Sequence, residues 1–209
     1  MTLEEAMAEI PIVAIIRGVK PDEVLDHVGA LKEAGIRIVE VPLNSPEPIV
    51  SIQRVVETFG HEMVCGAGTV LAVDRVDAVA EVGGRIIVAP DTRRDVIHTA
   101  LNRGLCPMPG FGTATEAFQA YDAGARYLKL FPASTYGTGH VQALKAVLPA
   151  DATVLAVGGA GPSNMAEWWA AGVRGFGLGG DLYKPGQTPA DTARKAKAAV
   201  EACRALARG

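Results

Sequence analysis

The stretch Tyr127–Pro132, YLKLFP, places a lysine inside an apolar run that has the length of a β-strand. Side chains alternate between the two faces of a strand, so Tyr127, Lys129 and Phe131 share one face and the two leucines share the other. A charged side chain in such a strand is unfavourable unless it is paired or functional. The stretch therefore predicts a buried strand whose lysine needs a partner or a chemical role.

Seven further runs of this kind recur along the chain, and their starts are about 20 to 26 residues apart. Between the runs lie amphipathic helical patterns such as residues 22–35, DEVLDHVGALKEAG, with a predicted start at Pro21 and Asp22 and a predicted end at Gly35. Strands that alternate with helices favour parallel pairing and right-handed crossovers. The predicted strands other than YLKLFP begin near Ile12, Ile38, Met63, Ile86, Pro107, Thr153 and Gly175.

Eight strand–helix units predict an α/β fold, a (β/α)8 TIM barrel, in one domain over residues 1–209. No low-complexity segment or Pro/Ser-rich linker marks a domain boundary. An open, doubly wound sheet is the alternative architecture. Its usual nucleotide-binding fingerprint, GxGxxG, is missing from the first strand–turn–helix, where IIRGVKP at 15–21 has a single glycine.

The composition is that of an ordinary globular protein, with 49% apolar and 21% charged residues. The net charge of −3 gives no reason to expect nucleic acid as a partner, and no apolar run is long enough to cross a membrane. The N-terminal residues lack the basic region of a signal peptide. Three cysteines without a CxxC pair argue against a disulfide framework, so we expect a cytoplasmic protein.

A glutamate interrupts the second predicted strand, IVEVPL at 38–43, much as the lysine interrupts the sixth. Even-numbered strands of a TIM barrel supply the same interior layers. Glu40 and Lys129 are therefore expected to converge from opposite walls, directly or through one water molecule. One interpretation is a buried ion pair that only neutralises itself. Such a pair adds little net stability, because the desolvation of both ions offsets their attraction.

The other interpretation is catalytic. A lysine that is desolvated in an apolar cavity has a lowered pKa, and its neutral amine attacks ketones to form an imine. The carboxylate of Glu40 suits the accompanying proton transfers. The sequence contains no HxH, HExxH or Cys/His cluster, and its histidines are scattered, so we expect neither a metal nor an organic cofactor.

Further polar and glycine positions lie at the ends of predicted strands. Arg17 ends the first strand, and its guanidinium suits a carboxylate or a phosphate. Thr69 follows the third strand and is expected either to bind substrate or to cap a helix. Loops after the last two strands of a barrel often bind phosphate through backbone N–H groups. The glycines of these loops are Gly158, Gly159, Gly161, Gly179 and Gly180.

Nearly the whole chain, from IPIVAIIRG at 10–18 to the motif that ends at Thr188, resembles the KDPG/KHG aldolase family. The length and the order of the matching motifs make this resemblance far more specific than one short motif. The motifs are IVEVPLNSP (38–46), CGAGTV (65–70), ATEAFQAYDAGARYLKLFPAS (114–134), ALKAVLP (143–149), AVGGAGPSN (156–164) and GLGGDLYKPGQ (177–187).

The resemblance implies a homotrimer that binds a small phosphorylated keto-deoxy sugar acid. Lys129 would be the Schiff-base lysine, and Glu40 would be the acid and base that works through water. Arg17 and Thr69 would contact the pyruvate-derived part of the substrate. The remaining expected substrate-binding residues are Asn44, Pro90 and Phe131, together with a phosphate end formed by Gly158, Gly159, Gly179, Asp181 and Leu182.

Asn44 separates two branches of the family. Members that act on phosphogluconate usually carry an arginine there, so the run EVPLNSP at 40–46 resembles the branch that cleaves the galactonate epimer. Two departures from the family pattern, Gly161 for a frequent threonine and Gly180 for a frequent serine, each remove a hydroxyl donor near the expected phosphate. Alternatives left open are the phosphogluconate or 4-hydroxy-2-oxoglutarate aldolase, a phosphate-binding barrel isomerase or synthase, and a non-enzymatic metabolite-binding protein.

Overall fold

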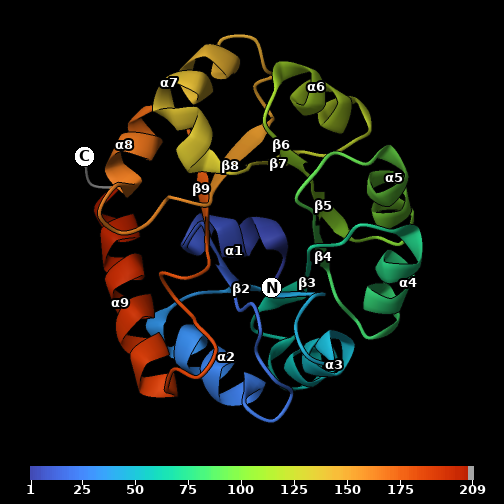
Figure 1. The fold of residues 1–209 in the computed structure, drawn as a ribbon, viewed down its shortest axis with the longest axis vertical. Coiled ribbons are helices and arrows are strands. Elements are labelled where there is room, and N and C mark those ends of the chain that lie inside the picture. The colour runs from blue at the N-terminus through green and yellow to red at the C-terminus, as the bar shows by residue number, and fades with distance from the viewer. Residues whose placement is uncertain (207–209) are drawn as a thin grey trace.

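The computed structural model describes residues 1–206, and its strands form one parallel sheet ringed by helices (Figure 1). The order of the strands in the sheet is β5-β4-β3-β2-β1-β9-β8-β7-β6. All of the recorded neighbours pair in parallel. The strands are β1 (Ile12–Ile15), β2 (Ile38–Pro42), β3 (Val64–Gly68), β4 (Ile86–Val88), β5 (Cys106–Met108), β6 (Gly110–Phe111), β7 (Tyr127–Leu130), β8 (Thr153–Val157) and β9 (Gly175–Leu178).

The fifth predicted strand is divided into β5 and β6, and this divided strand completes the ring. β5 pairs with β4 on one side, and β6 pairs with β7 on the other. The break falls at Pro109, which has no N–H to donate to a ladder but whose carbonyl oxygen accepts from Lys129 N at 2.9 Å. The result confirms the predicted eight-unit barrel and excludes the open, doubly wound sheet.

In the described part of the chain, eight helices cover the outside of the ring, and α1 lies across its N-terminal end (Figure 1). Thr2 caps α1 in a capping box with Glu5, and Gly35 ends α2 in the left-handed conformation that glycine adopts readily. The predicted start of α2 at Pro21 and Asp22 is too early, because these residues form a turn. The helices are α1 (Leu3–Glu9), α2 (Val24–Ala34), α3 (Pro48–Phe59), α4 (Val73–Glu81), α5 (Arg94–Asn102), α6 (Ala114–Asp122), α7 (Ala133–Lys145), α8 (Met165–Ala170) and α9 (Pro189–Leu206).

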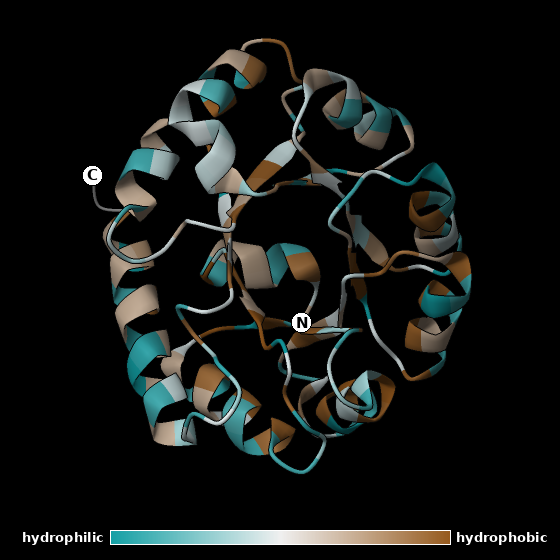
Figure 2. Ribbon diagram, in the orientation of Figure 1, coloured by the Kyte–Doolittle hydropathy of each residue, from teal (hydrophilic) through white to brown (hydrophobic). Residues whose placement is uncertain are grey.

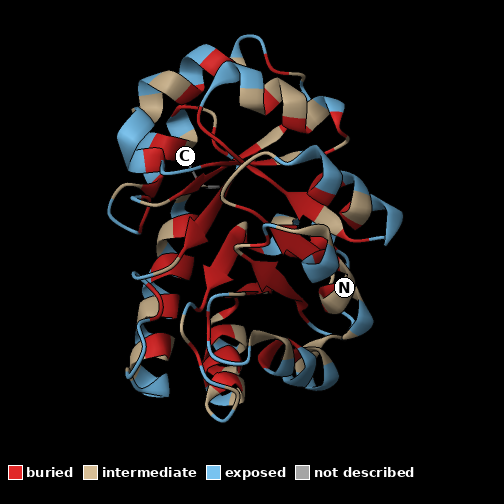
Figure 3. Cartoon of the chain, turned by 45° about the vertical axis from the view of Figure 1, so that its right-hand side comes forward, coloured by how far each residue is buried: buried red, intermediate tan, exposed pale blue. Residues whose placement is uncertain are grey.

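The strands have apolar residues on both faces, and the two faces belong to separate cores. Inward residues such as Val13, Ile38 and Leu155 form an inner core, which Leu3 and Ala6 of α1 close from below. Outward residues pack beneath the helices in a larger core. The strands are accordingly buried along their length (Figure 3), and hydrophilic and hydrophobic residues alternate along the helices around them (Figure 2). The alternation read from the sequence is confirmed.

The cysteines are free thiols, and Cys65 and Cys203 are buried. Burial raises the pKa of the Cys65 thiol to about 12, which suits its role as an apolar filler. Within residues 1–206, no helix combines the length and the apolar character that a bilayer crossing requires.

Phe176 in β9 is a direct test of the outer core, because its ring is fully buried and stacks near Trp169. Truncating a buried phenylalanine costs roughly 3–5 kcal/mol, since it removes apolar contact and leaves a cavity. We expect Phe176→Ala to lower the free energy of unfolding by that amount in urea titrations. Val147→Ala is the control: Val147 is 61% exposed, so this change should stay within about 0.5 kcal/mol of the wild type. A similar loss in both variants would contradict the described core.

Candidate active site

Lys129 and Glu40 lie inside the barrel, on the inward faces of β7 and β2. Their exposed fractions are 6% and 2%. Both border a cavity of about 10 Å³, which is close to the space that one water molecule needs. The other side chains that line it are apolar or absent: Val13, Ile15, Val88, Met108, Leu155, Val157 and Gly177. The barrel therefore brings the lysine and the glutamate to one apolar chamber.

Burial shifts the pKa values of both groups toward their neutral forms. The pKa of Lys129 is lowered mainly by desolvation and further by the charge of Arg17, and the charge of Glu40 opposes this shift. Desolvation raises the pKa of Glu40 from 4.5 to about 7, against the opposing charges of Lys129 and Arg17. Within residues 1–206, Glu40 Oε2 has no hydrogen-bond partner. An amine whose pKa is lowered and a carboxyl group whose pKa is raised to about 7 thus share the chamber.

Glycines in β3 leave the space that the Glu40 carboxylate occupies. A Cβ added to Gly68 would overlap both carboxylate oxygens, and one added to Gly66 would overlap the backbone of Ile86. Neither glycine has a positive φ, so glycine is needed at these positions to leave space rather than to allow a special backbone conformation. Gly68 is therefore required for placing a long acidic side chain inside this wall, whereas Gly66 lets β4 approach β3 closely.

Arg17, Asn44 and Thr69 form a polar cluster above the chamber, at the carboxyl ends of β1, β2 and β3. The Arg17 guanidinium donates to Asn44 Oδ1 at 2.5 Å and lies 3.4 Å from Thr69 Oγ1. Thr69 has a φ of 56°, a left-handed conformation that is unfavourable for a β-branched residue and that often marks functional sites. The structure removes the helix-cap alternative for Thr69, because α4 is capped at Ala72.

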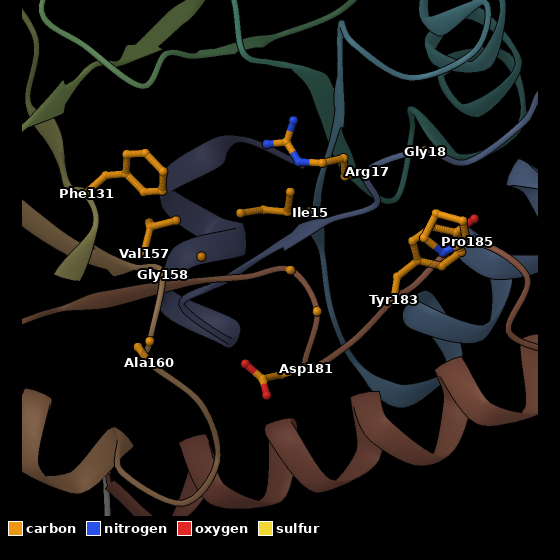
Figure 4. Close-up of a pocket in the computed structure, with 14 residues that line it drawn as sticks. Ile15, Arg17, Gly18, Phe131, Val157, Gly158, Ala160, Asp181, Tyr183 and Pro185 are labelled. Carbon is orange, nitrogen blue, oxygen red and sulfur yellow. The ribbon is translucent and has the colours of Figure 1, made fainter. Parts of the chain in front are cut away.

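A second pocket of about 400 Å³ opens above the chamber at the same end of the barrel. Ile15, Val157 and Gly177 border both spaces, so the pocket leads down to the chamber. In Figure 4, Arg17 and Phe131 extend toward each other from opposite sides of the pocket. The Lys129 amine lies 4.7 Å from the centre of the Phe131 ring. The geometry provides one continuous site with a polar mouth and an apolar floor.

Glycine-rich loops after β8 and β9 form one wall of this pocket. Gly158 and Gly159 have φ values of 82° and 97°, which side chains disfavour, and Asn164 ties their loop together by bonding Gly161 N and Gly159 O. Within the described part of the chain, several N–H groups of this wall make no other hydrogen bond and are available to an anion. They belong to Gly159, Ala160, Gly180 and Asp181.

Four expected residues are not in the lining of either space: Asn44 and Thr69, which lie in the polar cluster with Arg17, and Pro90 and Leu182. Pro90 follows β4, and its carbonyl group lies against Gly110 rather than facing the pocket. Leu182 is fully buried in the outer core, and its N–H already donates to Gly179 O at 2.8 Å. Both sit close in sequence to lining residues, namely Val88 and Asp181, without being lining residues themselves.

Several lining residues were not expected from the sequence, namely Ile15, Val157, Gly177, Tyr183 and Pro185. The strand alternation contained a signal for the first three, because inward positions nearest the carboxyl end of each strand must form the floor of the site. Tyr183 and Pro185 lie in an irregular loop, for which no periodicity exists. Among residues 1–206, no three His, Cys, Asp or Glu side chains gather closely enough to hold a metal ion.

Comparisons with known proteins agree on one family. The family model for KDPG and KHG aldolase matches residues 3–192. The chain is 50% identical over 196 residues to the 2-dehydro-3-deoxy-6-phosphogalactonate aldolase of Escherichia coli (strain K12), covering 94% of this chain and 96% of that protein.

Solved structures give the same result. A structure described as native KDPGal matches with a TM-score of 0.95 at 48% identity, covering 96% of this chain and 98% of that one. A cube-shaped protein cage, designed by fusing symmetric oligomeric domains, contains a chain with a TM-score of 0.94 and 48% identity, covering 96% of this chain and 74% of that one.

Gly68→Ala tests the space around Glu40. The added methyl group overlaps the carboxylate, so the glutamate must leave its position or the strand must shift. We expect the free energy of unfolding to fall by about 1–3 kcal/mol, as for other overpacked cores. Gly139→Ala is the matched control, because Gly139 has open space around it and no positive φ. Chemical denaturation of both variants measures the difference, and equal stabilities would contradict the described placement of Glu40.

The raised pKa of Glu40 predicts a pH-dependent stability. Between pH 4.5 and about 7 the folded chain retains a proton that the unfolded chain loses, so the free energy of unfolding falls as the pH rises. This contribution is complete below pH 4.5 and is lost as the pH passes 7, with a slope of at most about 1.4 kcal/mol per pH unit. Glu40→Gln should remove the slope in urea titrations across this range, and parallel profiles for the two proteins would refute the shift.

Proposed function

Because the chain belongs to the KDPG and KHG aldolase family, we propose that it is a class I, Schiff-base aldolase that cleaves 2-dehydro-3-deoxy-6-phospho-D-galactonate. The products are pyruvate and D-glyceraldehyde 3-phosphate. The observation that carries this proposal is the Lys129 amine, which is held in an apolar chamber beside Glu40 and below an anion-binding pocket. A chamber of this kind favours the neutral, nucleophilic form of the amine.

The first part of the reaction attaches the substrate to the enzyme. The neutral amine of Lys129 attacks the C2 ketone, and the resulting carbinolamine loses water to give a protonated imine. The positive charge of the imine makes it an electron acceptor for the next bond to break. Phe131, whose ring lies beside the amine, covers the approach from the β7 side and limits the access of water.

The second part breaks the C3–C4 bond. Glu40, acting through a water molecule, accepts the proton of the C4 hydroxyl group while the bonding electrons move into the imine and form an enamine. D-glyceraldehyde 3-phosphate leaves, the enamine takes up a proton at C3, and hydrolysis releases pyruvate and the free lysine. A carboxyl group with a pKa of about 7 suits both the uptake and the return of this proton.

The substrate spans the pocket between two groups of anion-binding residues. Arg17, oriented by Asn44 and Thr69, binds the carboxylate next to the reacting ketone. The loops at 158–160 and 179–181 bind the 6-phosphate through backbone N–H groups. Gly161 and Gly180 supply no hydroxyl group, so phosphate binding rests more on the backbone. The Asp181 carboxylate points toward the segment 158–160 in Figure 4. Its negative charge repels the phosphate from the outer edge of this wall.

The galactonate epimer is favoured over the alternatives by the sequence at Asn44 and by the similarity to the Escherichia coli enzyme. An arginine at this position would add a second cation beside Arg17, whereas Asn44 accepts a hydrogen bond from it. The C4 epimers present their hydroxyl groups differently to Glu40, so a small change in the pocket changes the preferred substrate. The phosphogluconate and 4-hydroxy-2-oxoglutarate activities are therefore the nearest competitors.

We also propose that the chain acts as a single domain, assembles into a homotrimer and works in the cytoplasm. The relative in the designed cage comes from a symmetric oligomeric domain, which supports a homo-oligomer. Some large apolar side chains remain exposed in one subunit, among them Leu71 and Val50. Burial of these side chains between copies of the chain would remove them from water, which also supports a homo-oligomer.

Borohydride reduction in the presence of pyruvate should add a covalent adduct at Lys129, which peptide mass spectrometry identifies. Lys129→Met should abolish both the adduct and the release of pyruvate, lowering kcat by at least about 10³-fold, because no other amine replaces the nucleophile. Lys145→Met is the control, since this lysine bonds Ala152 O on the outside of the barrel. The same assay should show faster turnover of the galactonate than of the gluconate epimer.

Other outcomes distinguish the remaining functions. An adduct on Lys145, or none, would exclude the proposed mechanism. Activity retained in Lys129→Arg would favour a barrel isomerase or synthase that uses the phosphate site without an imine. Faster turnover of the gluconate epimer would keep the mechanism and correct the substrate.

A further inference from the structure

The loop after β9, residues 179–188, forms part of the pocket and is fastened from behind by buried polar side chains. Its front residues Gly179 and Asp181 line the pocket. Its rear side chains reach α2 and α9, where His27 and Thr192 are 1% and 0% exposed. Polar groups at such depth are unfavourable unless each finds a hydrogen-bond partner. Their presence behind an irregular loop therefore calls for a reason.

Gln187 is the centre of these contacts. Its amide nitrogen donates one proton to Leu182 O at 2.7 Å and the other to Thr192 Oγ1 at 2.6 Å. Its amide oxygen accepts from Lys195 Nζ at 2.8 Å. Both donors and the acceptor of one side chain are thus in use, and one of them holds the backbone of the loop directly.

Thr192 passes this connection on to His27 in α2. Thr192 Oγ1 accepts from Gln187 and shares a hydrogen bond of 2.8 Å with His27 Nδ1, whose direction depends on the His27 tautomer. The backbone oxygen of Thr188, at 3.4 Å, is a second acceptor for the Thr192 proton. Burial lowers the pKa of His27 against the opposing charges of Glu23 and Asp26. Gln187, Thr192 and His27 form a hydrogen-bonded chain, which we call the loop clasp.

Tyr183 joins the loop clasp to the pocket itself. Its ring lies edge-on to His27 at 4.8 Å, its hydroxyl group donates to Glu23 Oε1 at 3.0 Å, and its side chain borders the pocket. Pro185, two residues further on, lies against Gly18, where an added Cβ would come within 2.7 Å of its ring. The segment 182–187 is held from α2, from α9 and from the loop that carries Arg17.

We propose that Gln187 is a positioning residue for the phosphate end of the site, and that through the loop clasp it fixes the N–H groups of Gly180 and Asp181 toward the anion. This inference rests on the proposed function, which places the 6-phosphate at that wall. Backbone donors bind an anion well only when they are held in one orientation, and misplacement by about 1 Å is enough to weaken such a site strongly. The absence of hydroxyl groups at Gly161 and Gly180 makes the backbone geometry more important in this chain.

The experiment measures binding of inorganic phosphate by isothermal titration calorimetry, so that its outcome does not depend on turnover. Gln187→Leu keeps most of the side-chain volume but loses all three hydrogen bonds, and Thr192→Val is nearly isosteric and loses only the hydroxyl group. We expect the Kd for phosphate to rise about fivefold to tenfold in each variant. Thr188→Ala is the control: this side chain caps α9 through Asp191 without touching the loop clasp, and its Kd should stay within about twofold of the wild type.

Kinetics separates positioning from general damage. For both variants, KM for the phosphorylated substrate should rise by the same factor, while kcat and the KM for unphosphorylated 4-hydroxy-2-oxoglutarate stay near wild-type values. Unchanged phosphate affinity in both variants, an equal effect on both substrates, or a wild type that does not bind phosphate would overturn the inference. Failure of the proposed function has a different signature, because it appears as a missing pyruvate adduct on Lys129 whatever the phosphate affinity.

Discussion

The structure depends on keeping one amine and one carboxyl group away from water inside a closed apolar barrel. The desolvation that lowers the pKa of Lys129 and raises that of Glu40 arises from the inner core beneath them, from the strands around them and from the loops above. Their mutual attraction partly opposes both shifts. A buried lysine and a buried glutamate lower the stability of a barrel compared with apolar residues at the same positions. Their presence is therefore best explained by their reactivity.

Space is the second constraint, and small residues supply it. In a barrel of this size, side chains ordinarily fill the interior completely. Here glycine stands at inward positions of β3 and β9, where a Cβ at Gly68 would overlap Glu40 and one at Gly177 would lie 2.6 Å from Val157. The removed side-chain volume becomes the chamber and the passage above it. The glycines of the loops have a different purpose, since Gly158 and Gly159 adopt positive φ and bring backbone donors to the pocket.

Most of the fold was predictable from the sequence, because strand alternation and unit length are local properties. The eight strand starts, the inward direction of Lys129 and Glu40 and the closed barrel follow from period-two patterns and spacing. The break at Pro109, the late start of α2 and the burial of Leu182 were missed. The first two are decided by local details of the backbone, and the third by packing of the loop after β9 into the outer core. Pro90 lies close to a strand end in sequence without lining either space, and its expected contact with substrate stays a prediction. The roles of the site residues stay predictions until the adduct is measured.

The arrangement separates the parts of the site that react from those that select. Lys129 and Glu40 stand on strands, whose ladders fix both backbones against movement. The proposed anion-binding groups stand on loops, which have no ladder and need other means of support. Asn164 provides it after β8, and Gln187 with Thr192 provides it after β9. These supports are not among the residues that line the chamber, so we expect changes in them to affect how a substrate is held rather than the pKa of the amine. A barrel of this kind can therefore change its preference among related keto acids while it keeps the same imine chemistry.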